Sequence, residues 1–173
     1  TMLRRTFRNY AKPVAAERNL HRVRTLSFAP RWAQPTADKM AAQEVLTLNQ
    51  KLLSAIGAGD YATYQSLCDP SLTCFEPEAV GHLVEGLDFH KYYFTMPAPS
   101  AATDASKPHV LNTMASPHVR VIGDKCAVVS YIRLTQKLVG GAPTTVQAEE
   151  TRVWEKKDSG WVHVHMHRSL IKM

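Results

Sequence analysis

The stretch PHVRVIGDKCAVVSYIRLTQKLV, residues 117–139, decides the fold class because it has the pattern of two strands joined by a turn. β-Branched and aromatic residues alternate with other residues on both sides of Gly123-Asp124, a pair typical of hairpin turns. TTVQAEETRVWEK (144–156) and WVHVHMHRSL (161–170) continue this pattern after further turn signals. The second half of the chain therefore predicts an antiparallel sheet of about four strands.

The preceding part of the chain predicts helices. Thr36 is a candidate N-cap of one long helix that stops at Gly57 and Gly59, and Asp60 begins a short second helix. A brief strand and a third helical segment, about residues 83–94, follow. Helices before a sheet indicate an α+β fold in which the long helix fills the concave face of the sheet. The predicted apolar stripe of that helix is Val45, Leu48, Leu52 and Ile56.

Size and composition favour one globular domain. A chain of 173 residues, 45% hydrophobic, can bury roughly 70% of the surface of its unfolded state. Three cysteines, Cys68, Cys74 and Cys126, stand at no ligand-like spacing, which argues against a disulfide framework and a zinc site. No apolar run approaches the roughly 20 residues that cross a bilayer, so no membrane partner is predicted.

The net charge of +6 comes from residues 1–39, which hold seven Arg and two Lys against two acids. The rest of the chain is nearly neutral, so no nucleic-acid partner is predicted. Within this leader, apolar residues recur at helical spacing beside arginines, which is typical of a mitochondrial or plastid presequence. Three alternatives for the leader remain open: a docking arm, a calmodulin-target-like helix and an ordinary basic tail. If the leader is not an organelle address, the protein is expected in the cytoplasm.

The predicted strand 126–138 is apolar on both faces. One face can pack against the long helix. The other has no second layer within a chain of this length, so we expect another copy of the protein to cover it. The alternative is that the polar loop 95–108 folds over it. The two faces are Ala127, Val129 and Tyr131 on one side, and Val128, Ile132 and Leu134 on the other.

Three arginines on adjacent strands, Arg133, Arg152 and Arg168, are predicted to point together to the wide end of the concave face. Glu150 is the only acid clearly in their stripes. Because a buried charge is costly unless it is paired, one carboxylate for three guanidinium groups predicts a bound carboxylate or acidic peptide. The alternative is that these arginines reach acids of neighbouring subunits.

The last strand has a strict alternation that predicts two faces. It places Trp161 with three histidines on one face and Val162, Val164, Met166, Arg168 and Leu170 on the other. A histidine pair at this spacing can bind zinc, but zinc needs three or four ligands with second-shell partners, and no further cluster is evident. No metal or other cofactor is predicted. The histidines are His163, His165 and His167.

About residues 41–170 resemble the association, or hub, domain of calcium/calmodulin-dependent protein kinase II. The resemblance is carried by DYATYQSLCDPSLTCFEPEAVGHLVEGLDFHKYYF (60–94), GDKCAVVSYIRLTQ (123–136), EETRVW (149–154) and WVHVHMHRS (161–169). It implies a hub-like domain over residues 40–173 with a cone-shaped, nuclear-transport-factor-2-like (SnoaL-like) fold. It also implies assembly into a closed ring of stacked dimers that gathers kinase subunits; calmodulin binding enters only at the level of the family.

The resemblance further implies a pocket for small carboxylates and peptide segments. Its arginines correspond to Arg133, Arg152 and Arg168, its histidine to His90, and a nearby tyrosine to Tyr64. The segment TMPAPSAATDASKP (95–108) departs from the pocket-flanking loop of the family, which carries a tryptophan in some members.

The chain contains no Gly-rich loop and no HRD or DFG motif, so it is not expected to phosphorylate anything. The predicted function is therefore a non-enzymatic oligomerisation hub, with a kinase partner in trans. The alternative is a small-molecule isomerase or dehydratase on the same fold. Its candidate acid–base groups are Glu150, His90 and Tyr64, and nearby guanidinium groups should make Glu150 a poor base.

Overall fold

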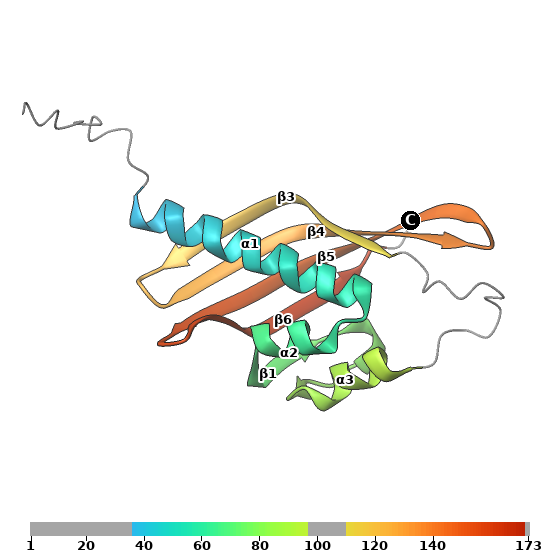
Figure 1. The fold of residues 1–173 in the computed structure, drawn as a ribbon, viewed down its shortest axis with the longest axis horizontal. Helices are drawn as coiled ribbons and strands as arrows, with labels where there is room; N and C mark the ends of the chain where they lie inside the picture. Colours follow the sequence, from blue (N-terminus) through green and yellow to red (C-terminus); the bar gives the residue numbers. More distant parts are fainter. Residues whose placement is uncertain (1–35, 97–109, 172–173) are drawn as a thin grey trace, which may run out of the picture. The chain divides into compact units, whose positions relative to one another are not determined.

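The computed structural model describes residues 36–96 and 110–171, and it confirms the predicted α+β class (Figure 1). Most of the predicted leader, and the loop 97–109, lie outside these residues. The elements are α1 (Ala37–Ala58), α2 (Tyr61–Leu67), β1 (Cys68–Phe75), the 3-10 helix η2 (Pro77–Ala79), β2 (Val84–Glu85), α3 (Asp88–Thr95), β3 (Leu111–Ile122), β4 (Cys126–Val139), β5 (Ala142–Lys157) and β6 (Gly160–Leu170).

Helix α1 begins at the predicted cap. The side chain of Thr36 accepts a hydrogen bond from the backbone N–H of Lys39 at 3.3 Å, and Gly59 ends the helix in the left-handed conformation with φ 68°. The helix runs through Gly57, which was predicted to stop it. A Cβ at this position would lie 2.5 Å from the carbonyl oxygen of Val110, so Gly57 permits the close approach of the helix to the chain that enters β3.

The sheet has six strands in the order β2-β1-β6-β5-β4-β3. Strands β3 to β6 are the four predicted antiparallel strands, and β1 adds to β6 in parallel. The brief strand β1 was expected, but its pairing was not, because it joins residues about 90 positions apart: Thr73 lies opposite His165. This parallel pair brings the chain after β1 to the end of β6.

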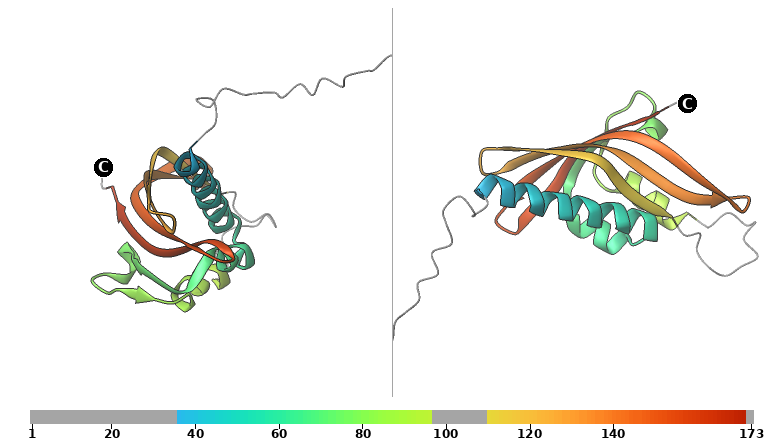
Figure 2. Two further views of the ribbon diagram at one scale, coloured as in Figure 1. Left: turned by 90° about the vertical axis from the view of Figure 1, so that its left-hand side faces the viewer. Right: turned by 90° about the horizontal axis from the view of Figure 1, so that it is seen from above.

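Helix α1 lies in the hollow of the curved sheet (Figure 2). Its buried residues Leu52 and Leu53 belong to the same core as Val129 and Trp154 of the sheet. The indole Nε1 of Trp154 donates to the side-chain oxygen of the buried Asn49 at 3.2 Å, which satisfies both polar groups. Burial of these apolar side chains fixes the helix against the sheet.

Strand β6 contains a bulge that overturns the predicted alternation. Val153 lies opposite His165 and Trp154 opposite His163, so Val164 is an extra residue in the ladder. Beyond it the side chains change faces. His163 therefore faces α1 together with Met166, while His165 does not, and the prediction that the three histidines share one face was wrong.

The outer face of strands β3 to β5 has no helix over it among the described residues (Figure 2). On β4, Val128, Ile132 and Leu134 point to this side and are partly exposed. The alternative cover, the loop 95–108, lies outside the described residues from residue 97 onward. Among the helices that the structure describes, none is both long enough and apolar enough to cross a membrane.

Candidate functional site

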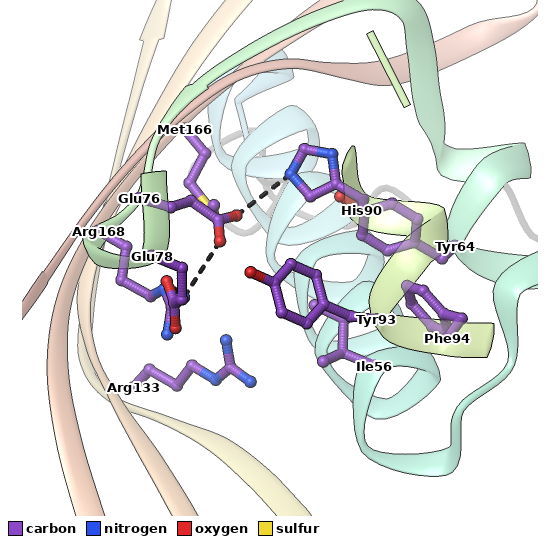
Figure 3. Close-up of a pocket in the computed structure, with 10 residues that line it drawn as sticks. All are labelled: Ile56, Tyr64, Glu76, Glu78, His90, Tyr93, Phe94, Arg133, Met166 and Arg168. Carbon is purple, nitrogen blue, oxygen red and sulfur yellow. Dashed lines mark hydrogen bonds and ion pairs between the residues drawn. The ribbon is translucent and has the colours of Figure 1, made fainter. Parts of the chain in front are cut away.

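A pocket of ≈ 210 Å³ opens beside the inner face of the sheet, where α1, α2, α3, η2, β4 and β6 meet (Figure 3). Its wall combines arginines and carboxylates on one side with aromatic and aliphatic side chains on the other. This volume is below the roughly 300–1,000 Å³ of drug-sized ligand sites, so the pocket suits a small molecule or one side chain of a peptide. The pocket is lined by Ile56, Tyr64, Glu76, Glu78, His90, Tyr93, Phe94, Arg133, Met166 and Arg168.

The structure divides the predicted site residues into two groups. Arg133, Arg168, His90 and Tyr64 line the pocket. Arg152 and Glu150 are only 1% and 2% exposed and lie beneath it, without lining it. A ligand in the pocket can therefore meet the first group directly, whereas Arg152 and Glu150 act on it through other side chains.

Glu150 is the buried acceptor at the base of the site. Arg133 Nη1 donates to one of its oxygens at 3.1 Å, and the other accepts from Arg152 Nη2 at 3.0 Å and from the hydroxyl of Tyr131. Burial alone would raise the pKa of Glu150, but the charges of Arg152 and Arg133 and these hydrogen bonds lower it to about 2. A carboxylate with this pKa is a poor general base near neutral pH.

Arg152 connects Glu150 to a buried histidine. Its Nε donates to the hydroxyl of Tyr131 at 2.8 Å, and its Nη1 lies 3.3 Å from His163 Nε2. Because a guanidinium group only donates, Nε2 of His163 accepts, which makes the ring neutral with its proton on Nδ1. Burial and then the charge of Arg152 lower the pKa of His163 well below its usual value.

Arg133 is held in place by an asparagine that the sequence did not single out. Its Nε donates to the side-chain oxygen of the buried Asn112 at 3.1 Å. The amide nitrogen of Asn112 in turn donates to the carbonyl of Leu53 in α1 at 3.2 Å. These contacts leave part of the Arg133 guanidinium group facing the pocket (Figure 3).

Arg168 meets two carboxylates that the sequence prediction missed. Its Nη2 donates to Glu76 at 3.1 Å and to Glu78 at 2.5 Å. With Glu150, the three arginines therefore have three carboxylates, so the inference of uncompensated positive charge was wrong. The sequence held one signal for Glu76. Cys74 is a buried residue of β1, and because side chains alternate along a strand, Glu76 two residues later lies on the same side as Cys74.

His90 pairs with the same acidic segment. Its Nε2 lies 3.1 Å from Glu76 and 3.4 Å from the thiol of Cys74. Burial raises the pKa of Glu76, but the hydrogen bond from His90 and the charge of Arg168 bring it below its usual value. Glu76 is thus an anion held by a histidine and an arginine.

The donor atoms of Cys74, Glu76 and His90 lie within 4.8 Å of one another, a spacing that metal ions use. Two features favour a hydrogen-bond network here. Burial, followed by the charge of Glu76, raises the pKa of Cys74 to about 12, so its sulfur is a thiol in this network. His90 Nε2 donates to Glu76 and lies beside the sulfur of Cys74, so the three side chains are joined by short contacts without an ion.

Aromatic rings form the opposite wall of the pocket. The ring centroids of Tyr64 and Phe94 lie 5.1 Å apart, and those of Tyr64 and His90 lie 5.7 Å apart. Tyr64 is 2% exposed, and its burial raises the pKa of its hydroxyl, which stays neutral. The pocket can therefore take a molecule with a negative group at the arginine side and an apolar body against the rings.

Comparisons with known proteins agree with this architecture. The sequence family described as calcium/calmodulin dependent protein kinase II association domain matches residues 41–171. The delta subunit of rabbit (Oryctolagus cuniculus) calcium/calmodulin-dependent protein kinase type II is 46% identical over 132 residues, which are 76% of this chain and 24% of the relative. The chain therefore spans about a quarter of the length of this relative.

Solved structures show the same relationship. The hub homology domain of this kinase from Chlamydomonas reinhardtii is 79% identical, with a TM-score of 0.72 over 76% of this chain and 98% of that one. A protein from Streptomyces avermitilis, assigned as a dehydratase of the nuclear-transport-factor-2-like family, is 20% identical, with a TM-score of 0.60 over 78% and 98%. The second likeness confirms the predicted fold type. The chain belongs to the calcium/calmodulin-dependent protein kinase II association domain family.

Proposed function

We propose that this association domain assembles with copies of itself into a closed ring of stacked dimers. The observation that carries the proposal is the outer face of β4, where Val128, Ile132 and Leu134 are partly exposed and no described helix lies over them. Val153 of β5 lies directly opposite Val128 and extends the same apolar surface. Burial of such a face against another copy is favourable, and closed symmetry repeats one interface around a ring.

A single charge on this face tests the proposed interface. In Ile132→Glu, a carboxylate would have to be buried at the contact between copies, so the assembly should dissociate while the fold of the monomer stays intact. Ile132→Val is the matched control and should keep the wild-type mass. Native mass and circular dichroism report the two properties separately; an Ile132→Glu variant of unchanged mass contradicts an interface at this face.

The proposal includes the binding of small carboxylates or peptide segments in the pocket. Support comes from Arg133 and Arg168 on one side of the pocket and Phe94 and Met166 among its other lining residues. Benzoate has a carboxylate and a flat apolar body of suitable size, and benzyl alcohol is its neutral counterpart. Calorimetric titration should detect binding of benzoate and not of benzyl alcohol, and Arg168→Met should weaken it. Equal binding of the two compounds contradicts the role of the arginines.

A ring of these domains would hold several partners at high local concentration. Because the matched relative is a subunit of a calcium/calmodulin-dependent protein kinase, we propose a kinase as one such partner. We also propose that the basic residues 1–39 carry an organelle address or a docking arm. Localisation of a fluorescent fusion with and without these residues distinguishes the two roles.

One observation favours an enzyme as the second candidate. His90 and Glu76 form a hydrogen-bonded pair inside the pocket, and such a pair can serve in acid–base chemistry. The enzyme hypothesis predicts that a small-molecule substrate is turned over and that His90→Gln abolishes the turnover without loss of fold. Against it, Glu150 is fully engaged with Arg133, Arg152 and Tyr131.

A further inference from the structure

The two carboxylates on Arg168 are held in different ways. Glu76 has a side chain that is 8% exposed, and its second oxygen is bonded to His90 at 3.1 Å. The side chain of Glu78 is 38% exposed, and Arg168 is its only side-chain hydrogen-bond partner in the described parts of the chain. Glu76 is therefore fixed, whereas Glu78 has a single contact to lose.

The backbone around Glu78 is also lightly held. Glu78 lies in η2, a helix of three residues that has no side-chain cap. Val80, which follows η2, is 80% exposed. Short 3-10 segments on a surface have few contacts that resist a local shift. The side chain of Glu78 can thus rotate into solvent without disturbing the core.

Glu78 occupies the place that an anion in the pocket would take. Its carboxylate sits on the guanidinium group of Arg168, and Arg133 and the hydroxyl of Tyr93 face the same space (Figure 3). Burial, followed by the negative charges of Glu78 and Glu76, raises the pKa of Tyr93. The carboxylates of Glu76 and Glu78 therefore offset the charges of the two arginines that line the pocket.

We infer that Glu78 is an internal carboxylate that occupies Arg168 when the pocket is free, and that a carboxylate ligand must displace it. Glu78 then sets the affinity of the pocket for anions. A ligand displaces Glu78 only if its apolar contact with the aromatic wall adds enough binding free energy. This inference rests on the proposed carboxylate binding. It predicts selection of small carboxylates with an apolar body over acetate or inorganic anions.

The size of the effect follows from occupancy. If Glu78 holds Arg168 in about nine of ten molecules, the apparent dissociation constant is about tenfold higher than for the vacated pocket. Removal of the negative charge also removes repulsion of the incoming anion, which acts in the same direction. We therefore expect Glu78→Gln to bind benzoate about tenfold more tightly than the wild type.

The experiment is a calorimetric titration of the full chain with benzoate. Glu78→Gln and Glu78→Ala are the test variants. Glu85→Gln is the matched control, because Glu85 is an exposed carboxylate that does not line the pocket and its replacement changes the net charge equally. Thermal unfolding and native mass establish that each variant keeps its fold and assembly. Arg168→Met in the Glu78→Gln background should abolish the gain.

The outcomes separate this inference from the function on which it rests. Tighter binding by both Glu78 variants, with Glu85→Gln unchanged, supports the internal carboxylate. Benzoate binding of equal strength in the wild type and Glu78→Gln overturns it and leaves the carboxylate pocket intact. An equal gain in Glu85→Gln also overturns it, as an effect of net charge alone. No binding of benzoate by the wild type or any variant contradicts the carboxylate pocket itself.

Discussion

Arg152 and Glu150 form a buried ion pair on the same face of β5, with Nη2 and Oε2 at 3.0 Å and side chains 1% and 0% exposed. Removal of one partner leaves the other charge buried and unpaired. Arg152→Ala should therefore lower the free energy of unfolding by about 3–5 kcal/mol. Urea unfolding followed by circular dichroism measures this loss.

The same substitution distinguishes a structural role from direct binding. Because Arg152 does not line the pocket, its replacement should act on ligands only indirectly, through the fold and through the side chains that Arg152 holds in place. The half-exposed surface pair of Lys157 and Glu155, at 3.8 Å, gives a control in which Glu155→Ala should leave the unfolding free energy almost unchanged. A fully stable Arg152→Ala variant that has lost benzoate binding would contradict a purely structural role of Arg152.

The free energy of unfolding should depend on pH because His163 is buried as a neutral ring. Its pKa is lowered well below the usual value in the folded state, mainly by burial and then by Arg152, whereas the unfolded chain titrates near pH 6.5. Below about pH 6.5 the unfolded state binds a proton that the folded state does not, so stability is lost as the pH falls, by up to about 1.4 kcal/mol per pH unit. Above that pH this loss is absent.

His163→Gln removes the titrating ring and should flatten the decline in unfolding free energy between about pH 6.5 and 5. Burial also lowers the pKa of His165, but this ring is less enclosed, so it should add a smaller loss of stability of the same sign. The variant His165→Gln is therefore the comparison for His163→Gln. Glu150 contributes little in this range, because its own loss of stability begins as the pH falls through its unfolded-state pKa of 4.5 and continues toward its folded pKa of about 2. A slope unchanged in His163→Gln contradicts a neutral buried ring.

Gly57 gives a test of the approach between α1 and the chain entering β3. Glycine to alanine inside a helix usually stabilises a protein by up to about 1 kcal/mol. Here the new Cβ would stand 2.5 Å from the backbone oxygen of Val110, so Gly57→Ala should instead cost about 1–3 kcal/mol. Thermal unfolding decides the sign, and a raised melting temperature would mean that the helix and Val110 are farther apart.

The sequence predicted those features that depend on local pattern. Alternation located β3 to β6. Thr36 and Asp60 were predicted as caps from their residue types, and their side chains do accept from N–H groups three residues on. The bulge at Val164 was missed because an extra residue leaves the alternation of letters intact while it changes the face of every side chain beyond it. Gly57 was misread because a glycine signals either a stop or a close contact.

The pocket was only half predictable for a similar reason. Arg133 and Arg168 were found because each extends a stripe on its own strand. Glu76 and Glu78 were missed because they reach Arg168 from a segment about 90 residues earlier, through the parallel pairing of β1 with β6. Charge balance between distant segments cannot be read from the pattern of one strand.

The central claim is that the outer face of the sheet joins copies of this chain in a closed ring. Size-exclusion chromatography with light scattering on the full chain tests it most directly. The account predicts one particle at an even multiple of 19.3 kDa, well above the mass of a dimer and unchanged on dilution. A particle of 19.3 kDa at every concentration would contradict it.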